Sequence, residues 1–109
     1  MRQITKLAVQ KFLNAEDFSN RNTKVEAGFG CVRMYLHDNE IATKIGNREY
    51  IIDTCGWFSD TTKERLNGLL DALGKPKIYQ KNFEWFLMDK KWNGSEIRLK
   101  KNDWEYVRK

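Results

Sequence analysis

Apolar residues recur along the chain at two spacings, one typical of helices and one typical of strands. The first helical stripe lies near the N-terminus and consists of Ile4, Leu7, Ala8 and Phe12. Because apolar positions three and four residues apart lie on one face of a helix, this stripe predicts a helix over residues 4–14. Further along, apolar and polar residues alternate, as they do in strands that are buried on one face.

A second helical stripe consists of Leu66, Leu69, Leu70 and Leu73. Thr61 followed by Glu64 fits a capping box, in which Thr61 is the N-cap and Glu64 is the third helical residue. Gly74 can adopt the left-handed conformation that commonly ends a helix, and Pro76 prevents the helix from continuing. The sequence therefore predicts a helix that begins at residue 61 and packs its leucines onto a sheet.

The alternating segments predict two β-meanders, one after each helix. The first comprises expected strands over residues 23–27, 31–37, 40–45 and 48–54. The second comprises expected strands over residues 77–81, 83–88, 95–100 and 104–108. Asn93-Gly94 lies within the second meander and is a strong signal for a two-residue hairpin turn.

The last third of the chain echoes the first half. Glu40-Ile41 reappears as Glu96-Ile97, and Glu49-Tyr50 reappears as Glu105-Tyr106, both at an offset of 56 residues. An internal repeat decides the architecture of a fold before other signals do. We therefore predict an α+β fold in one domain, residues 1–109, built from two tandem αββββ units over residues 1–56 and 57–109, with the helices packed on antiparallel sheets.

The composition supports a hydrophobic core. Of the 109 residues, 40% are hydrophobic and 13% are aromatic, which is unlike an intrinsically disordered chain. No stretch approaches the length of an apolar membrane span, so we expect a protein of the cytoplasm without a membrane partner. The residues expected in the core are Leu36, Ile41, Ile52, Leu66, Leu69, Leu70 and Leu87.

The net charge of +5 comes entirely from the last third of the chain, since positive and negative residues balance over residues 1–74. Residues 75–109 also hold seven of the fourteen aromatic residues. Interleaved lysines and aromatic rings can neutralise phosphates and stack on bases. The candidate nucleic-acid contacts are Lys90, Lys91, Trp92, Lys100, Lys101 and Trp104. The alternative interpretation is a sheet with a lysine-rich solvent face.

The sequence suggests no catalytic residues, no metal site and no cofactor. Cys31, Cys55 and His37 are too few and too scattered for a metal site or a disulfide framework, and His37-Asp38 is more typical of a turn than of acid–base chemistry. Trp57 and Phe58 precede the second helix and are possible interface anchors, because tryptophan is enriched in binding hot spots. Alternatively, one of the pair covers the junction between helix and sheet.

Several segments resemble a family of small proteins of unknown function from tailed bacteriophages, over roughly residues 35–94. The similar segments are residues 40–42, 56–57, 61–67, 79–81, 85–87 and 92–94. The resemblance implies a phage protein made in the bacterial cytoplasm, and it brings no activity, cofactor or catalytic residue. Small phage proteins often bind host components. We therefore expect a non-enzymatic protein that binds a host protein or defence complex, or alternatively an accessory protein that binds DNA or RNA. The oligomeric state stays open.

Overall fold

The computed structural model describes residues 2–46, 48–100 and 106–108, with side chains described for residues 2–46 and 48–99. The helices in this part of the chain are α1 (Gln3–Leu13) and α2 (Asp60–Ala72). The strands before α2 are β1 (Phe18–Asn20), β2 (Thr23–Gly28), β3 (Cys31–Leu36), β4 (Asn39–Ile45) and β5 (Glu49–Ile52). The strands after α2 are β6 (Tyr79–Lys81), β7 (Glu84–Leu87), β8 (Lys90–Lys91), β9 (Ile97–Lys100) and β10 (Tyr106–Arg108).

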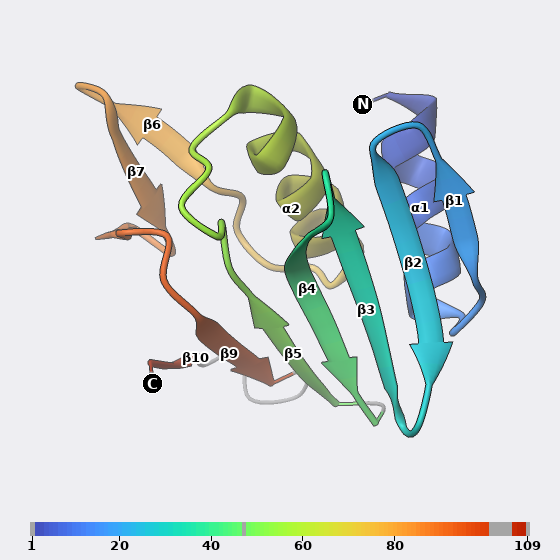
Figure 1. Cartoon of the computed structure of the whole chain (residues 1–109). Coiled ribbons are helices and arrows are strands. Elements are labelled where there is room, and N and C mark those ends of the chain that lie inside the picture. The colour runs from blue at the N-terminus through green and yellow to red at the C-terminus, as the bar shows by residue number, and fades with distance from the viewer. Residues whose placement is uncertain (1, 47, 101–105, 109) are drawn as a thin grey trace.

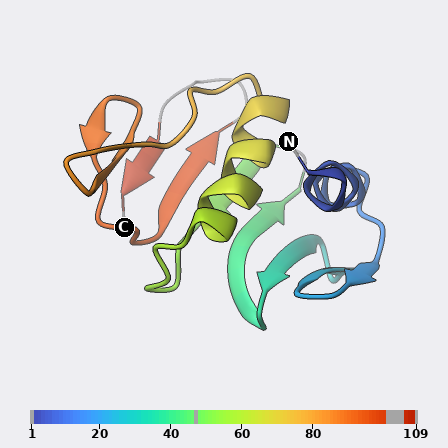
Figure 2. The ribbon, with the colours of Figure 1, turned by 90° about the horizontal axis from the view of Figure 1, so that it is seen from above.

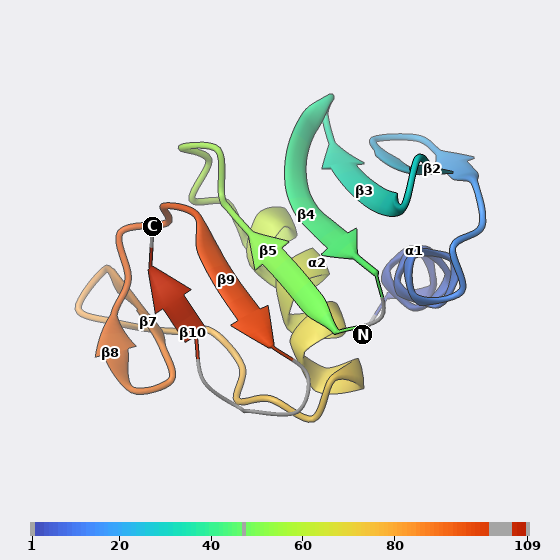
Figure 3. The ribbon, with the colours of Figure 1, turned by 90° about the horizontal axis from the view of Figure 1, so that it is seen from below.

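The strands form two antiparallel sheets. The larger sheet has seven strands in the order β1-β2-β3-β4-β5-β9-β10, and β6, β7 and β8 form a separate sheet of three strands. Both helices lie on the same face of the larger sheet (Figures 1 and 2). Strands β9 and β10 lie at one edge of the larger sheet. The small sheet lies beside this edge (Figure 3). The predicted α+β class with antiparallel sheets is confirmed.

Neither α1 nor α2 is long and apolar enough to cross a membrane, and the described residues contain no further α-helix.

The predicted duplication into two αββββ units is not confirmed. The strands before α2 form one continuous meander, whereas those after α2 are divided between the two sheets. The sequence echo coincides with two strand pairs that are neighbours in the larger sheet, β4–β5 and β9–β10. The registers of these two pairs differ. Tyr50 pairs with Lys44. Tyr106, its counterpart, pairs with Leu99 and not with Lys100, the counterpart of Lys44.

The predicted hairpin at Asn93-Gly94 is wrong, because β8 and β9 belong to different sheets. The Gly94 carbonyl instead accepts hydrogen bonds from the backbone N–H (3.0 Å) and the hydroxyl (3.1 Å) of Thr54. Just before it, Trp92 is buried against Trp85, with 6.4 Å between the ring centroids. Burial of this aromatic pair and the bonds to Thr54 set the path of the chain between the sheets.

Helix α1 forms as predicted, but its buried face is turned by about one residue. The buried residues are Thr5, Ala8, Val9 and Phe12. Ile4 and Leu7, which belong to the apolar stripe that predicted this helix, are only half-buried. Thr5 takes a core position because its hydroxyl accepts a hydrogen bond of 2.6 Å from the buried guanidinium of Arg65.

Helix α2 begins earlier than the capping-box pattern predicted. Its N-cap is Ser59, whose hydroxyl accepts a hydrogen bond of 3.1 Å from the backbone N–H of Thr62. Glu64 does not serve the helix end, since its carboxylate binds Arg65 at 2.6 Å. At the other end Gly74 has a φ of 72° and the N–H of Lys75 donates to the Leu70 carbonyl at 2.9 Å, which confirms the predicted glycine stop.

A buried arginine connects both helices to the larger sheet. The Arg65 side chain is 1% exposed. Its Nε donates to the Thr23 hydroxyl of β2 at 3.1 Å, and its Nη1 donates to Thr5 of α1 and to the Glu64 carboxylate, each at 2.6 Å. Burial lowers the pKa of the Arg65 guanidinium, and the Glu64 carboxylate opposes this shift. The charge is thus kept in the core by a carboxylate and two hydroxyls.

The predicted core is confirmed. All seven residues named for it are buried, with at most 3% of each side chain exposed: Leu36, Ile41, Ile52, Leu66, Leu69, Leu70 and Leu87. Buried residues from both halves of the chain, including Val25 and Leu99, belong to the same hydrophobic cluster.

Candidate functional site

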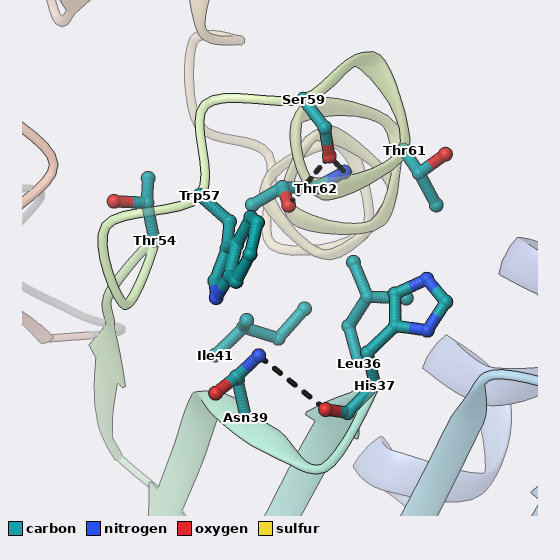
Figure 4. A pocket seen from close by; sticks show the side chains of 9 residues that line it. All are labelled: Leu36, His37, Asn39, Ile41, Thr54, Trp57, Ser59, Thr61 and Thr62. Atoms are coloured by element: carbon teal, nitrogen blue, oxygen red, sulfur yellow. Dashed lines mark hydrogen bonds between the residues drawn. The ribbon is translucent and has the colours of Figure 1, made fainter.

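A pocket of about 410 Å³ opens where α2 begins. Leu36 and Ile41, both buried, form its floor. Trp57 and His37 stand on opposite sides of it, and Ser59 closes it from the start of α2 (Figure 4). The site therefore combines three segments: the β3–β4 hairpin, the loop after β5 and the first turn of α2.

A β-bulge helps to form the floor of this pocket. Met34 pairs with Ala42, and Tyr35 pairs with Glu40, so that Ile41 is an extra residue in β4. Neighbours in a regular strand point to opposite faces, yet Ile41 and Ala42 are both buried. The irregularity therefore allows β4 to place Ile41 under the pocket while Ala42 stays in the core.

Hydrogen bonds fix the loop that carries Trp57. The Thr54 hydroxyl is buried and donates to the Gly94 carbonyl at 3.1 Å, and it accepts from the Gly56 N–H at 3.3 Å. The Trp57 N–H donates to the Thr54 carbonyl at 3.0 Å. The backbone at Trp57 is thus held by a buried threonine, which places the indole without any ligand.

The two aromatic residues named as possible anchors have different surroundings. Phe58 is 49% exposed and packs edge-on against Trp85 of the small sheet, with 5.0 Å between the ring centroids. Phe58 therefore packs on the small sheet, whereas the alternative interpretation placed one of the pair over the junction between helix and sheet. Trp57 is 61% exposed, and its ring forms a wall of the pocket (Figure 4).

Polar groups surround the apolar floor of the pocket. The hydroxyls of Ser59 and Thr62 lie 2.9 Å apart at the start of α2. Across the pocket, the Asn39 amide donates to the His37 carbonyl at 3.4 Å (Figure 4). His37 has a φ of 50°, which places this turn in the left-handed region. The pocket can therefore receive an apolar group on its floor and hydrogen-bonding groups at its edge.

A thiol, that of Cys55, lies in the loop that carries Trp57. Burial raises the pKa of the Cys55 thiol, and the Asp53 and Glu40 carboxylates raise it further. The thiol donates to the Glu40 carbonyl at 2.9 Å. Because the thiolate is the reactive form, a raised pKa disfavours the reactive form of this cysteine. Within residues 2–46, 48–100 and 106–108, no three His, Cys, Asp or Glu side chains gather to hold a metal ion.

The structure changes the predicted nucleic-acid surface at Trp92. Its side chain is 2% exposed, and the indole N–H donates to the Ser95 carbonyl at 2.9 Å. A buried ring offers no face to a nucleobase, so the expected stacking role of Trp92 is wrong. Lys90 and Lys91 are exposed in β8, and the Lys91 ammonium lies 2.9 Å from the Glu84 carboxylate.

The other three candidate nucleic-acid contacts lie partly or wholly outside the described residues. The backbone of Lys100 ends β9 in the larger sheet, whereas β8 belongs to the small sheet. The side chain of Lys100 lies outside the described part, as do residues Lys101 and Trp104 altogether.

Sequence patterns missed most of the pocket. Leu36 and Ile41 were identified only as core residues, and Asn39 and Ser59 were not singled out. The pocket combines the β3–β4 hairpin with the segment from Thr54 to Thr62, and no local spacing relates these two parts of the chain. Trp57 was the pocket residue that the sequence marked as a possible interface anchor.

Comparison with known proteins gives a family. Residues 1–106 match the model of the Kyanoviridae Gp96 protein family, which comes from tailed cyanophages. No curated protein and no solved structure matches the chain. The match covers nearly the whole chain and confirms the resemblance to small proteins of tailed phages. The chain belongs to the Kyanoviridae Gp96 protein family.

Proposed function

We propose that this phage protein is a non-enzymatic binding protein that acts in the host cytoplasm on a host protein or defence complex. The observation that carries this proposal is the exposed Trp57 beside a pocket with an apolar floor. Tryptophan is enriched among residues that dominate binding energy, especially where a pocket adjoins it. The partner would insert an apolar side chain between Trp57 and His37, over Leu36 and Ile41.

The pocket beside Trp57, lined by Leu36, Ile41, His37 and Ser59, is called the Trp57 pocket. Its preorganisation supports this role. The Thr54 hydrogen bonds hold the loop, and the Ser59 cap holds the first turn of α2. Binding then needs little ordering of the backbone, which is a major cost of association. The hydroxyls and the amide at the edge of the pocket can bond to the partner's backbone.

Nucleic-acid binding stays the second candidate, on a surface other than the expected one. On the small sheet, Tyr79 and Phe86 stack with 5.3 Å between centroids, and Phe86 pairs in register with Lys91. Exposed Lys90 and Phe83 extend this basic and aromatic surface. Such a surface can contact phosphates and bases of a single strand. The pairing of Lys91 with Glu84 opposes this role.

The two candidates are distinguished by capture from lysate of the cyanobacterial host, with and without nuclease. We expect tagged protein to retain a specific protein partner after nuclease treatment, since the Trp57 pocket recognises a protein side chain. Loss of every captured protein on nuclease treatment, together with binding of purified DNA or RNA at low salt, would favour the small-sheet surface. Capture of no protein in either sample would contradict the proposed function.

A further inference from the structure

A second cavity, of about 360 Å³, lies at the N-terminal end of α1. The turn between β1 and β2 passes beside this helix end (Figure 1). Three arginines line the cavity: Arg2, Arg21 and Arg65. The amides of Asn20 and Asn22 also line it, and none of its lining residues belongs to the Trp57 pocket.

The charge of this arginine cavity is only partly neutralised. The Glu64 carboxylate binds Arg2 at 3.3 Å and Arg65 at 2.6 Å. No ion pair is found for Arg21 within the described part of the chain. Three guanidinium groups thus face one carboxylate, which leaves an excess of positive charge around a concave site.

Arg65 gives the cavity a fixed, buried donor. The hydrogen bonds to Thr23, Thr5 and Glu64 engage Nε and Nη1 of the guanidinium, so Nη2 is the nitrogen left for a ligand. The side chain is 1% exposed and cannot swing away. A donor of this kind is already oriented before a ligand arrives, which favours tight binding.

The end of α1 adds backbone donors to the same cavity. Arg2 is the N-cap and makes no side-chain capping bond, and the first turn contains no acidic residue. The first backbone N–H groups of a helix have no partner within the helix, and the helix dipole makes this end positive. Gln3 and Ile4 belong to this turn and line the cavity.

We propose that the arginine cavity binds a phosphate group, either as free inorganic phosphate or as the phosphate of a small monoester. Guanidinium groups match the oxygens of phosphate through paired hydrogen bonds, and helix N-termini bind the same group. Asn20, Asn22, Arg2 and Arg21 would surround the anion, and Arg65, which also lines the cavity, would supply a buried donor. This activity goes beyond the proposed protein binding, because it uses a separate surface.

The test is a titration of labelled protein followed by amide NMR signals, at constant ionic strength. Inorganic phosphate, adenosine monophosphate and acetate are the three probes. We expect saturable shifts at Gln3, Ile4 and the Arg65 Nε–H with inorganic phosphate, at a dissociation constant of ~1 mM or below. Acetate should bind at least about tenfold more weakly, since its two oxygens meet fewer of the donors.

Three variants make the test specific. Arg21→Gln should weaken phosphate binding about tenfold, since a charge-assisted hydrogen bond is lost. Glu64→Gln should strengthen it, because the competing carboxylate is removed. Arg48→Gln is the matched control, an exposed arginine just before β5 that does not line the cavity, and it should change nothing. The amide spectrum of each variant shows whether it is folded.

Each outcome decides the proposal. Adenosine monophosphate that binds about tenfold tighter than inorganic phosphate identifies a monoester as the ligand, and equal binding identifies free phosphate. Absence of saturable shifts with both phosphates overturns the proposal. Equal binding of acetate, or unchanged binding by Arg21→Gln and Glu64→Gln, overturns it as well.

Discussion

Replacement of Arg65 with alanine is expected to lower the free energy of unfolding by about 3–5 kcal/mol, the usual effect of removing one partner from a buried ion pair. The change leaves the hydroxyls of Thr5 and Thr23 without their donor and the Glu64 carboxylate without its buried partner. It also removes the side chain that connects α2 to α1 and β2. Urea unfolding monitored by tryptophan fluorescence measures this loss.

Two controls distinguish the effect of the buried Arg65 network on stability from the effect of removing any arginine charge. Arg48→Ala removes an exposed arginine and should change the free energy of unfolding by no more than about 0.5 kcal/mol. The double variant Arg65→Met with Glu64→Gln should recover part of the loss, because it also removes the Glu64 carboxylate, which in Arg65→Ala keeps only Arg2 and Thr5 as partners. A loss of less than about 1 kcal/mol for Arg65→Ala would contradict the role assigned to this network.

Replacement of Gly94 with alanine is expected to cost about 3 kcal/mol and to disturb the Trp57 loop. A Cβ at this position would lie 2.3 Å from the Thr54 hydroxyl oxygen and 2.6 Å from the Phe58 ring. Gly94 also has a φ of +82°, which disfavours any side chain. Because Thr54 is buried and bonded to this same residue, it has little room to move.

Two other glycines show which part of this cost is backbone strain. Gly30 has a φ of +79° and nothing within 4 Å of an added Cβ, so Gly30→Ala should cost only about 1 kcal/mol. Gly28 has neither a positive φ nor a close neighbour, and Gly28→Ala should be neutral within about 0.5 kcal/mol. Thermal or urea unfolding of the three variants gives the comparison. Equal losses in the free energy of unfolding for Gly94→Ala and Gly30→Ala would contradict the expected clash between a Cβ at residue 94 and Thr54.

The sequence predicted local elements well because their signals are local. The leucine stripe, Gly74 and the alternating segments identified α2 and most strands, and the core residues followed from the same periodicity. Strand β1 has three residues, Phe18–Asn20, and this is too short to show a period. The start of α2 was missed because Glu64 binds Arg65 rather than the helix end, and this pairing also depends on Thr5, 59 residues from Glu64.

The arrangement of the strands depended on long-range pairing, which periodicity does not report. The echo between the two halves suggested equivalent meanders, yet β9 pairs with β5 and extends the first sheet. The alternating pattern of a strand specifies which of its residues face the core. It does not specify which other strand pairs with it. The small sheet separated because Trp85 and Trp92 are buried together, and the sequence did not distinguish this from exposed rings.

Two residues of segment 61–67, one of those that resemble the phage family, have structural roles. Arg65 forms the buried network. The Asn67 amide donates to the Ile78 carbonyl at 3.0 Å and its oxygen accepts from the Ile78 N–H at 2.6 Å, which fixes the chain before β6 to α2. Such pairing replaces a missing strand partner. Neither residue lines the Trp57 pocket, so the resemblance at these two positions does not mark that pocket.

The central claim, that the Trp57 pocket binds a host protein, is tested most directly by the affinity of single variants for the partner captured after nuclease treatment. Trp57→Ala should weaken binding at least about tenfold, as expected for an anchor tryptophan. Phe29→Ala is the matched control, because Phe29 is fully exposed in the β2–β3 turn at the other end of the sheet, and its affinity should equal that of the unaltered protein. Unchanged affinity of Trp57→Ala, or a loss confined to Phe29→Ala, would contradict the account.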